Sequence, residues 1–486
     1  LMAGYSQESQ KYRSLGGQRI VFPVKTMYEI DGMGSSNQST TGGLTEWAFR
    51  SYFGRANYTY KGKYLLEGNF RYDGTSKISE DNRWGFFPSG SIAWRISEED
   101  FIKNSIGWID NLKIRASYGL LGNADIGNYP YQETYSTTSY GFSEAMEQGV
   151  IQSSFKNKKL EWEKTKITDL GLDFNLKENI LYGTLDLYNK YTTGILASAS
   201  IPSSAGMSAP TINYGEFKNY GLELSLGHTG KVGDFTYDVN AQVSINRNKV
   251  MKYPAPSYGT RVIEEGKPYR DYYLYEYTGI FKSEDEIEKV TTPGNPQIGD
   301  IKFKDQDTSG GIDGKDRVRM DGAFPDFIYS FGANCTWKNF DLNLFFQGVK
   351  GQKFLLNGWG IVPFVQSSSP LPKYLNAYDP LTNPGSDIPS IYSDGYAPMT
   401  GGTAAGSTFY LNDASYLRLK NIQLGYNMPS SLLKSIDISQ LRIFIGGDNL
   451  LTFTKYDYGD PERSGDGRAC EYPQIKTVFV GLNLKF

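Results

Sequence analysis

The chain has 486 residues, a formal net charge of −3, one histidine and two cysteines. A net charge this close to zero gives no reason to expect nucleic acid as a partner, and the single histidine, His228, argues against catalysis or metal binding centred on histidine. No run of about 18 apolar residues occurs, which excludes a transmembrane helix.

Apolar and polar residues alternate with period two along most of the chain, a pattern that predicts β-strands with one apolar and one polar face. Fourteen strands are predicted, in chain order at 1–12, 46–60, 64–73, 84–96, 110–121, 161–176, 181–193, 218–227, 235–249, 326–337, 341–350, 414–428, 440–453 and 478–486. In the hairpin 46–73 the turn is Tyr60-Lys61-Gly62-Lys63, and the tyrosines beside it suit the aromatic girdle of a membrane protein.

Two short helices are predicted between strands. One begins at Ser97, with Asp100 as its capping-box partner, and the other covers 430–436. The hairpin 218–249 carries the clearest alternation of the chain, and its turn is predicted to run from His228 to Asp234. In the strand 414–428 the alternation slips by one residue near Lys420, which indicates a β-bulge.

Short and long connections alternate along the chain. The short or helical ones are predicted at 60–63, 97–109, 177–180, 228–234, 338–341 and 428–440, and the long ones at 13–44, 122–160, 194–217, 250–325, 353–413 and 454–474, with 76–83 as a short exception. Outer-membrane barrels have short periplasmic turns and long external loops, so this alternation favours a transmembrane antiparallel β-barrel. A soluble β-sandwich would also alternate, but it would not require apolar side chains on the outward face of every strand.

The two cysteines and the first residues complete the topological predictions. Cys335 and Cys470 fall at opposite ends of the predicted barrel, so no disulfide is expected between them. The opening residues, LMAGYSQESQ, contain neither a basic segment nor a cleavage site, so no signal peptide is expected here. Because an outer-membrane barrel needs such a signal, we interpret the sequence as part of a longer protein.

Several segments resemble SusC-type TonB-dependent outer-membrane transporters. They are FRYDGTSK (70–77), RWGFFPSGSIAWRISEEDFIKN (83–104), LKIRASYGLLGN (112–123), LEWEKTKITDLGLDF (160–174), SYLRLKNIQLGYNMP (415–429), IFIGGDNLLTFTKYDYGDPE (443–462) and VFVGLNLKF (478–486). The resemblance implies a barrel of about 22 strands, with residues 1–486 as its C-terminal portion and with the plug domain, TonB box and signal peptide absent from this sequence.

The resemblance also implies a function in the outer membrane of a Gram-negative bacterium. That function is import of a bulky nutrient, an oligosaccharide or a peptide, with coupling to TonB and a SusD-like surface lipoprotein as partner. The alternative is a passive outer-membrane pore of about 14 strands that closes on its own. No enzymatic activity is expected, because a single histidine in a predicted turn offers no nucleophile–base pair.

The stretch DQDTSGGIDGKD, residues 305–316, has the spacing of a calcium-binding loop. Its predicted ligands are Asp305, Asp307, Ser309, the backbone carbonyl of Gly311, Asp313 and Asp316. Gly310 occupies the position of the sharp turn, and Ile312 is expected to point inward. The alternative is an ion-free surface turn, since Asp and Gly are common turn residues. The calcium ion would be structural, holding a long external loop.

Three further sets of residues have two interpretations each. Trp359, Tyr140 and Tyr258 lie in predicted external loops, where they would either stack on sugar rings or pack within the loops. The predicted lumen residues Glu67, Arg71, Lys113, Arg115, Asp173, Glu223 and Asp238 would either line a polar path or contact the plug. The final alternating strand, ending in Phe486, is either a signal for barrel assembly or simply a last strand.

Overall fold

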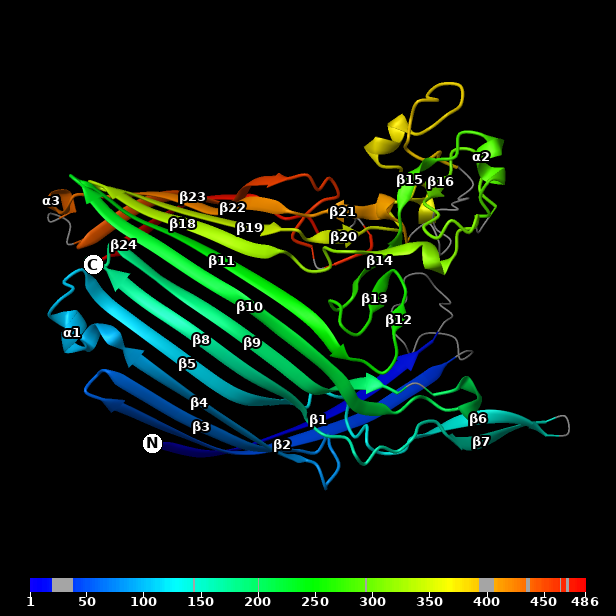
Figure 1. Cartoon of the computed structure of the whole chain (residues 1–486), viewed down its shortest axis with the longest axis horizontal. Coiled ribbons are helices and arrows are strands. Elements are labelled where there is room, and N and C mark those ends of the chain that lie inside the picture. Colours follow the sequence, from blue (N-terminus) through cyan, green and yellow to red (C-terminus); the bar gives the residue numbers. More distant parts are fainter. Residues whose placement is uncertain are drawn as a thin grey trace.

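The computed structural model describes residues 1–19, 38–142, 145–199, 201–292, 295–392, 406–433, 438–463, 465–468 and 472–486. Fourteen long strands form one antiparallel sheet, here called the wall (Figure 1). In sheet order they are β1 (Met2–Gln18), β2 (Ser39–Tyr60), β3 (Tyr64–Thr75), β4 (Trp84–Arg95), β5 (Ile109–Asn123), β8 (Glu163–Leu176), β9 (Leu181–Ser198), β10 (Thr211–Val232), β11 (Phe235–Lys252), β18 (Phe327–Trp337), β19 (Phe340–Lys350), β22 (Tyr416–Asn427), β23 (Gln440–Thr454) and β24 (Thr477–Lys485).

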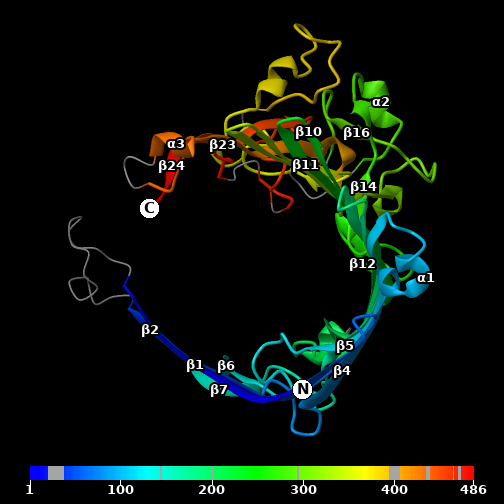
Figure 2. The same cartoon turned by 90° about the vertical axis from the view of Figure 1, so that its left-hand side faces the viewer.

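The wall is a single curved layer, and Figure 2 shows it as an arc around a central space. Each strand pairs with the next wall strand in sequence, so the sheet has two ends, β1 and β24, which do not pair with each other. The predicted all-β class and the predicted fourteen strands are therefore confirmed, while the sheet formed by the described residues is open.

The outward face of the wall is apolar and exposed. Its exposed large side chains include Leu66, Ile92, Ile114, Leu170, Leu187, Leu226, Leu424, Ile443, Ile445, Val480 and Leu482. Leu170 is 54% exposed and Ile92 59% exposed although both lie in the middle of long strands. Aliphatic side chains at this exposure are stable in lipid and not in water, so a sandwich of two sheets is excluded.

Both chain termini lie at the same end of the wall as the short connections (Figure 1). Gly62 and Lys61 have positive φ values of 68° and 52°, and the Lys63 amide donates to the Tyr60 carbonyl at 3.0 Å, so this tight turn forms as predicted. At the same end, the Tyr60 ring lies 6.4 Å from the Tyr64 ring. Such aromatic pairs form the expected girdle.

The helix predicted from Ser97 differs from the observed one. A 3-10 helix at Ile96–Glu98 precedes helix α1 (Asp100–Lys103), whose N-cap is Glu99, and no side-chain cap forms. Instead, the Glu99 carboxylate accepts hydrogen bonds from Tyr64, Lys63 and Trp94. These bonds lower the pKa of Glu99 to about 2. The predicted capping box is therefore wrong. Glu99 occupies the N-cap position, and its carboxylate binds Tyr64, Lys63 and Trp94 instead of the helix backbone.

Other predicted boundaries need correction, because several strands extend beyond the expected ends. The loop predicted at 13–44 is wrong at both ends: β1 and β2 pair as far as Gln18 and Ser39. Glycine, serine and threonine weaken the strand signal, but the continuous ladder holds them in the sheet. The loop at 194–217 shortens in the same way, since β9 ends at Ser198 and β10 begins at Thr211.

His228 does not lie in a turn. It belongs to β10, opposite Val239, and its ring stacks on Tyr237 at a centroid distance of 5.7 Å. The turn is shorter than predicted and consists of Gly233 and Asp234. The predicted bulge near Lys420 is confirmed by a register shift between Leu419 and Asn421.

The last helix and the cysteines are only partly within the described residues. Helix α3 spans Ser430–Leu433, and the remainder of the predicted 430–436 lies outside the described residues. Cys335 lies in β18 as a free thiol, whereas Cys470 is outside the described residues, so the absence of a disulfide stays a prediction.

The long connections contain secondary structure of their own. Their elements are the hairpin β6 (Tyr135–Phe142) and β7 (Ala145–Gln152), the strands β12 (Ser257–Tyr258), β13 (Arg261–Ile263), β14 (Asp271–Tyr275), β15 (Tyr277–Ile280), β16 (Ile301–Phe303), β17 (Arg317–Met320), β20 (Lys353–Leu355) and β21 (Leu411–Asp413), and helix α2 (Glu284–Glu288). Short 3-10 helices lie at Ser203–Ala205, Gly314–Asp316, Val365–Ser367, Pro372–Asn376 and Thr408–Tyr410. Among the described residues, no helix has the length and apolarity needed to cross a membrane.

The outward face can be tested with a charge. Replacing Leu170 with lysine should destabilise the folded protein in lipid bilayers by about 2–4 kcal/mol, because the ammonium would face hydrocarbon. Ser225 lies on the polar inner face beside a hollow, so Ser225→Lys is the matched control and should cost far less. Denaturant titration of the protein in lipid vesicles measures both, and equal losses would contradict the assigned faces.

Candidate functional site

The inner face of the wall carries the polar residues that the sequence predicted for the lumen. Arg71 binds Asp73, with Arg71 Nη2 3.0 Å from Asp73 Oδ1, and Glu67 pairs with Arg55 across the strands. Lys113 Nζ lies 2.6 Å from Asp173 Oδ2. Five of the seven predicted lumen residues, Glu67, Arg71, Lys113, Arg115 and Asp173, therefore form ion pairs with one another or with other inward residues.

Arg115 is the centre of the densest group of these ion pairs. Its guanidinium lies 2.6 Å from Asp186, 3.2 Å from Asp173 and 3.3 Å from Asp169, so one side chain on β5 connects β5, β8 and β9. Glu223 on β10 is directly opposite Asp186. Carboxylates outnumber cations in this sector, which leaves the inner surface acidic there.

Inward glycines let long side chains cross a strand. Gly171 lies between Arg115 and Asp186 in the sheet, and a methyl group at Gly171 would overlap the guanidinium that spans them. Gly221 lies between Tyr188 and Asn246 in the same way, and the Tyr188 hydroxyl donates to Asn246 across it at 3.0 Å.

The same arrangement recurs twice more. Tyr182 crosses Gly227 to reach Asp238, and Arg442 crosses Gly425 to reach Asp341. Because each glycine has no side chain, a long side chain from one neighbouring strand can pass over it and hydrogen-bond a residue of the other neighbouring strand.

Hollows on the inner face of the described wall include two that lie beside these ion pairs. One, of about 470 Å³, is lined in part by Glu67, Arg115 and Asp169. The other, of about 640 Å³, is lined in part by Asp186, Glu223, Gln242, Ser244, Ser330 and Gln347. Carboxylates, amides and hydroxyls at these positions can hydrogen-bond either a passing polar solute or another protein segment.

At the external end, two long connections, the described residues of 253–326 and 351–415, pack into one body, here called the outer domain. Tyr456, from a third connection after β23, is buried in its core. This core contains Tyr272, Leu274, Tyr275, Ile301, Phe303, Ile312, Phe354, Leu355, Leu356, Ile361, Val362, Tyr410, Ala414 and Tyr456. The residues of this core come from three connections between wall strands, so these three connections fold together (Figure 1). The sequence predicted these connections as long loops without such packing.

The candidate calcium loop lies within this outer domain. Asp305, Asp307 and Asp316 have carboxylate oxygens that all lie within 4.8 Å of one another. Asp316 is fully buried and accepts hydrogen bonds from the backbone amides of Gln306 and Asp313 at 2.8 and 2.7 Å. Ile312 is 4% exposed, so its inward position is confirmed.

The other predicted ligands are arranged differently. Ser309 Oγ donates to the Gly311 carbonyl at 3.1 Å, so both face the same turn. Asp313 lies apart from the three converging carboxylates, because its side chain caps the 3-10 helix at Gly314–Asp316 and accepts from the Lys315 amide at 2.7 Å. Hydrogen bonding to Ser309 lowers the pKa of the Asp307 carboxyl, which keeps it ionised.

The three loop aromatics do not form a shared platform. Tyr140 is 65% exposed on β6, and its ring centroid lies 5.4 Å from that of Phe142 at a tilted angle. Tyr258 is 61% exposed and lies 5.8 Å from the Tyr273 ring, while Trp359 is 38% exposed. Their role in sugar binding stays a prediction.

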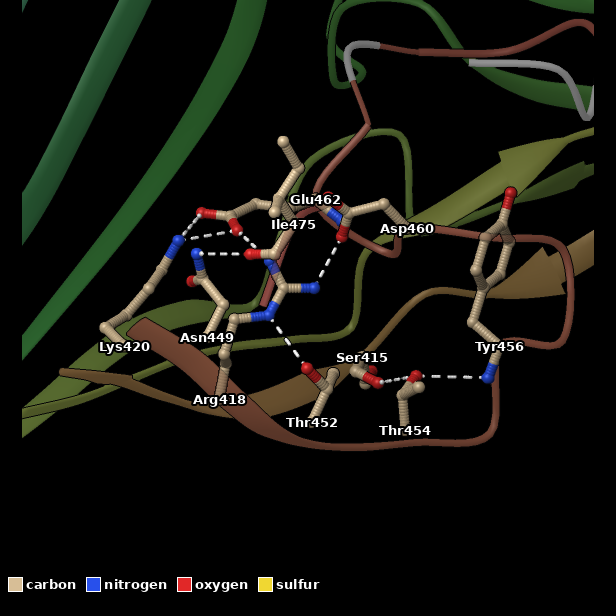
Figure 3. Close-up of polar contacts among 10 residues, drawn as sticks. All are labelled: Ser415, Arg418, Lys420, Asn449, Thr452, Thr454, Tyr456, Asp460, Glu462 and Ile475. Atoms are coloured by element: carbon tan, nitrogen blue, oxygen red, sulfur yellow. Dashed lines mark hydrogen bonds and ion pairs between the residues drawn. The ribbon is translucent and has the colours of Figure 1, made fainter. Parts of the chain in front are cut away.

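A cluster of polar side chains surrounds Arg418 on β22 and was not predicted from the sequence. Figure 3 shows its guanidinium between Thr452, Asp460 and Glu462, with Lys420 on the second side of Glu462. Arg418 is 2% exposed. The available signal was an arginine and a lysine in one strand, followed about 40 residues later by acidic residues in the stretch YDYGDPE.

Comparison with known proteins identifies the fold's family. The family described as TonB dependent receptor-like, beta-barrel, matches residues 4–450. The chain belongs to this family. Its members are receptors and transporters of the outer membrane of Gram-negative bacteria rather than enzymes, so the localisation expected from the sequence is confirmed.

Individual relatives agree with this assignment. TonB-dependent receptor P3 of Formosa agariphila is 34% identical over the whole chain, which spans 50% of that relative. TonB-dependent receptor SusC of Bacteroides thetaiotaomicron is 27% identical over 90% of the chain and 43% of its own length. The resemblance to SusC-type barrels is thereby confirmed.

A solved structure of the RagAB peptide transporter matches the whole chain with a TM-score of 0.80 and 26% identity, and the chain covers 53% of it. The chain thus spans about half the length of the relatives that it matches.

The inward glycines give a direct test of the wall. In Gly221→Ala the new methyl group would overlap both the Tyr188 hydroxyl and the Ile245 carbonyl oxygen, so we expect a loss of about 1–3 kcal/mol in unfolding free energy. Gly68→Ala is the control, because no atom lies within 4 Å of the added methyl, and it should be neutral or stabilising. Urea unfolding in lipid vesicles distinguishes them, and equal losses would contradict the steric argument.

Proposed function

We propose that this chain is the C-terminal portion, residues 1–486, of an active outer-membrane transporter that imports a bulky nutrient with energy supplied through TonB. The observation that carries the proposal is the wall itself, apolar and exposed outside, and polar with ion pairs inside. Membership of a family named for TonB dependence supports the coupling. An oligosaccharide or a peptide is the proposed substrate class; the RagAB relative is named a peptide transporter, which favours a peptide.

The complete barrel is proposed to contain about 22 strands. Bilayer hydrocarbon cannot hydrogen-bond the free backbone groups of an edge strand, so β1 and β24 both need partners there. The chain spans only about half of its relatives, which leaves room for further strands and for a plug. A plug would cover the acidic sector around Arg115 and Glu223, and a SusD-like lipoprotein would contact the external side.

The passive pore of about 14 strands is the alternative. It would require β1 and β24 to pair, whereas the described wall is open between them (Figure 2). No covalent chemistry is proposed for either function, because His228 is a strand residue stacked on Tyr237 rather than part of a nucleophile–base pair.

Import can be tested in cells that produce the full-length protein. Uptake of labelled oligosaccharides and peptides should stop when an uncoupler dissipates the proton gradient, because the plug moves only under force from the inner membrane. A passive porin in the same cells is the control and should continue to conduct. Uptake that persists with the uncoupler, together with swelling of liposomes that contain the purified protein, would favour the passive pore.

We also propose a structural calcium ion held by Asp305, Asp307 and Asp316. Three carboxylates within 4.8 Å repel one another, and among the described residues no lysine, arginine or histidine forms an ion pair with them. Oxygen ligands of this kind suit a hard divalent cation. Ser309 and the Gly311 carbonyl are proposed as additional ligands, and Asp313 through a bridging water.

Calorimetry on the full-length protein in detergent tests this ion. We expect calcium to bind with a Kd of about 10⁻⁴ to 10⁻³ M, as in extracellular calcium modules, and the double substitution Asp305→Asn with Asp307→Asn to abolish the heat. Asp321→Asn is the matched control, because Asp321 is exposed and pairs with Lys353 instead. Absence of calcium heat in the unsubstituted protein would remove the proposal.

A further inference from the structure

The connection after β23 joins the wall to the outer domain. It leaves the sheet at Thr454, and its described residues 455–463 and 465–468 are here called the clasp. Tyr456 is 4% exposed in the core of the outer domain, where its ring lies 6.2 Å from Phe354 and 5.7 Å from Tyr458. Tyr456 therefore fixes the start of the clasp in the core of the outer domain, while several later clasp residues stay exposed.

The first anchor holds the clasp to the wall. Arg418 on β22 donates from Nη2 to Asp460 at 2.6 Å, from Nη1 to Glu462 at 2.5 Å and from Nε to Thr452 at 2.9 Å (Figure 3). Lys420 Nζ contacts both oxygens of Glu462 at 2.7 Å. The positive charges of Arg418 and Lys420 are matched by the carboxylates of Asp460 and Glu462, so the buried guanidinium has charged partners.

The second anchor holds the clasp to the outer domain. Asp466 accepts from Arg261 Nη2 at 2.7 Å, from the Tyr272 hydroxyl at 2.7 Å and from the Leu355 amide at 2.8 Å. Burial raises the pKa of the fully buried Tyr272 hydroxyl, so it remains a donor. The three donors come from two different long connections.

Backbone hydrogen bonds continue this second anchor. The Gly467 amide donates to the Leu355 carbonyl at 3.0 Å, and the Asn357 amide donates to the Gly467 carbonyl at 3.1 Å. Gly467 has a φ of 113°, which a residue with a Cβ rarely adopts. The clasp thus forms a short parallel bridge with Leu356, the residue that follows β20.

We propose that the clasp locks the outer domain onto the wall at β22 and β23, so that the outer domain is a fixed half of the barrel mouth and not a moving lid. Arg418 and Asp466 are then positioning residues: they contact no substrate but fix the shape of the mouth. The chain around β4, β5 and β8 packs on a separate small core of Ile78, Phe87, Ala124 and Trp162, which the clasp does not hold.

Hydrogen exchange on the full-length protein in detergent tests the clasp. In Arg418→Met, Asp460 and Glu462 lose their fork-shaped partner, and amides of β14 and β20 should exchange about tenfold faster through local opening. Wall strands β5 and β8 should be unchanged. Arg442→Met is the matched control, because Arg442 pairs with Asp341 within the wall and does not contact the outer domain.

A second variant separates unlocking from misfolding. Asp466→Asn keeps the wall anchor and weakens only the outer one, because an amide nitrogen would replace the oxygen that faces Arg261, so it should raise exchange in the same outer strands. Arg418→Lys retains the positive charge but not the planar guanidinium that donates to two carboxylates at once. Its outer-strand amides should exchange at a rate between those of the unsubstituted protein and Arg418→Met. Unchanged exchange in the outer strands of both Arg418→Met and Asp466→Asn would overturn the proposal. This measurement does not depend on what the protein imports, so it can fail while the transport function holds.

Discussion

Backbone hydrogen bonding in lipid is the constraint on which the rest of this structure depends. Hydrocarbon offers no donors or acceptors, so every amide and carbonyl of a crossing strand must pair with a neighbouring strand. The fourteen wall strands meet this demand by pairing in sequence order, each with the next. The side chains are then free to differ on the two faces, aliphatic outside and polar inside, as in other transmembrane barrels.

Glycines on the inner face make room for long polar side chains of the neighbouring strands. Large polar side chains such as Arg115 and Tyr188 would collide with a neighbouring strand if every inward position carried a side chain. Glycine at 171 and 221 removes that collision, and the long side chains connect strands that are two apart. Strand-to-strand polar bonds of this kind hold the wall where it encloses water rather than an apolar core.

Alternation in the sequence predicts the wall well, because the membrane imposes period two on each strand. Leu170 and Leu172 alternate with Asp169, Gly171 and Asp173, a pattern that predicts both leucines on the lipid face. The short turns at 60–63 and 177–180 follow from their positions between alternating runs. The same logic fails at 13–18 and 39–44, where glycine, serine and threonine form strands without an apolar signal. It also misplaced His228, since a polar residue near a strand end resembles a turn residue.

The outer domain could not be predicted from local patterns. Its core joins Tyr272, Leu355 and Tyr456 from three separate connections, and period-based reasoning cannot recognise contacts across such separations. The Arg418 cluster has the same character, since its partners are 42 and 44 residues away. The candidate calcium loop can be read from the sequence because its proposed ligands are local, although capping of a 3-10 helix draws Asp313 away from the other carboxylates.

The central claim is that lipid surrounds the wall and water fills its interior. Fluorophores attached to single cysteines in the protein in bilayers, with quenchers confined to lipid tails, measure this most directly. Labels at Ile92, Leu170 and Leu482 should be strongly quenched, and labels at Ser91, Ser225 and Gln242 should not. Quenching of the second set, or its absence from the first, would contradict the account.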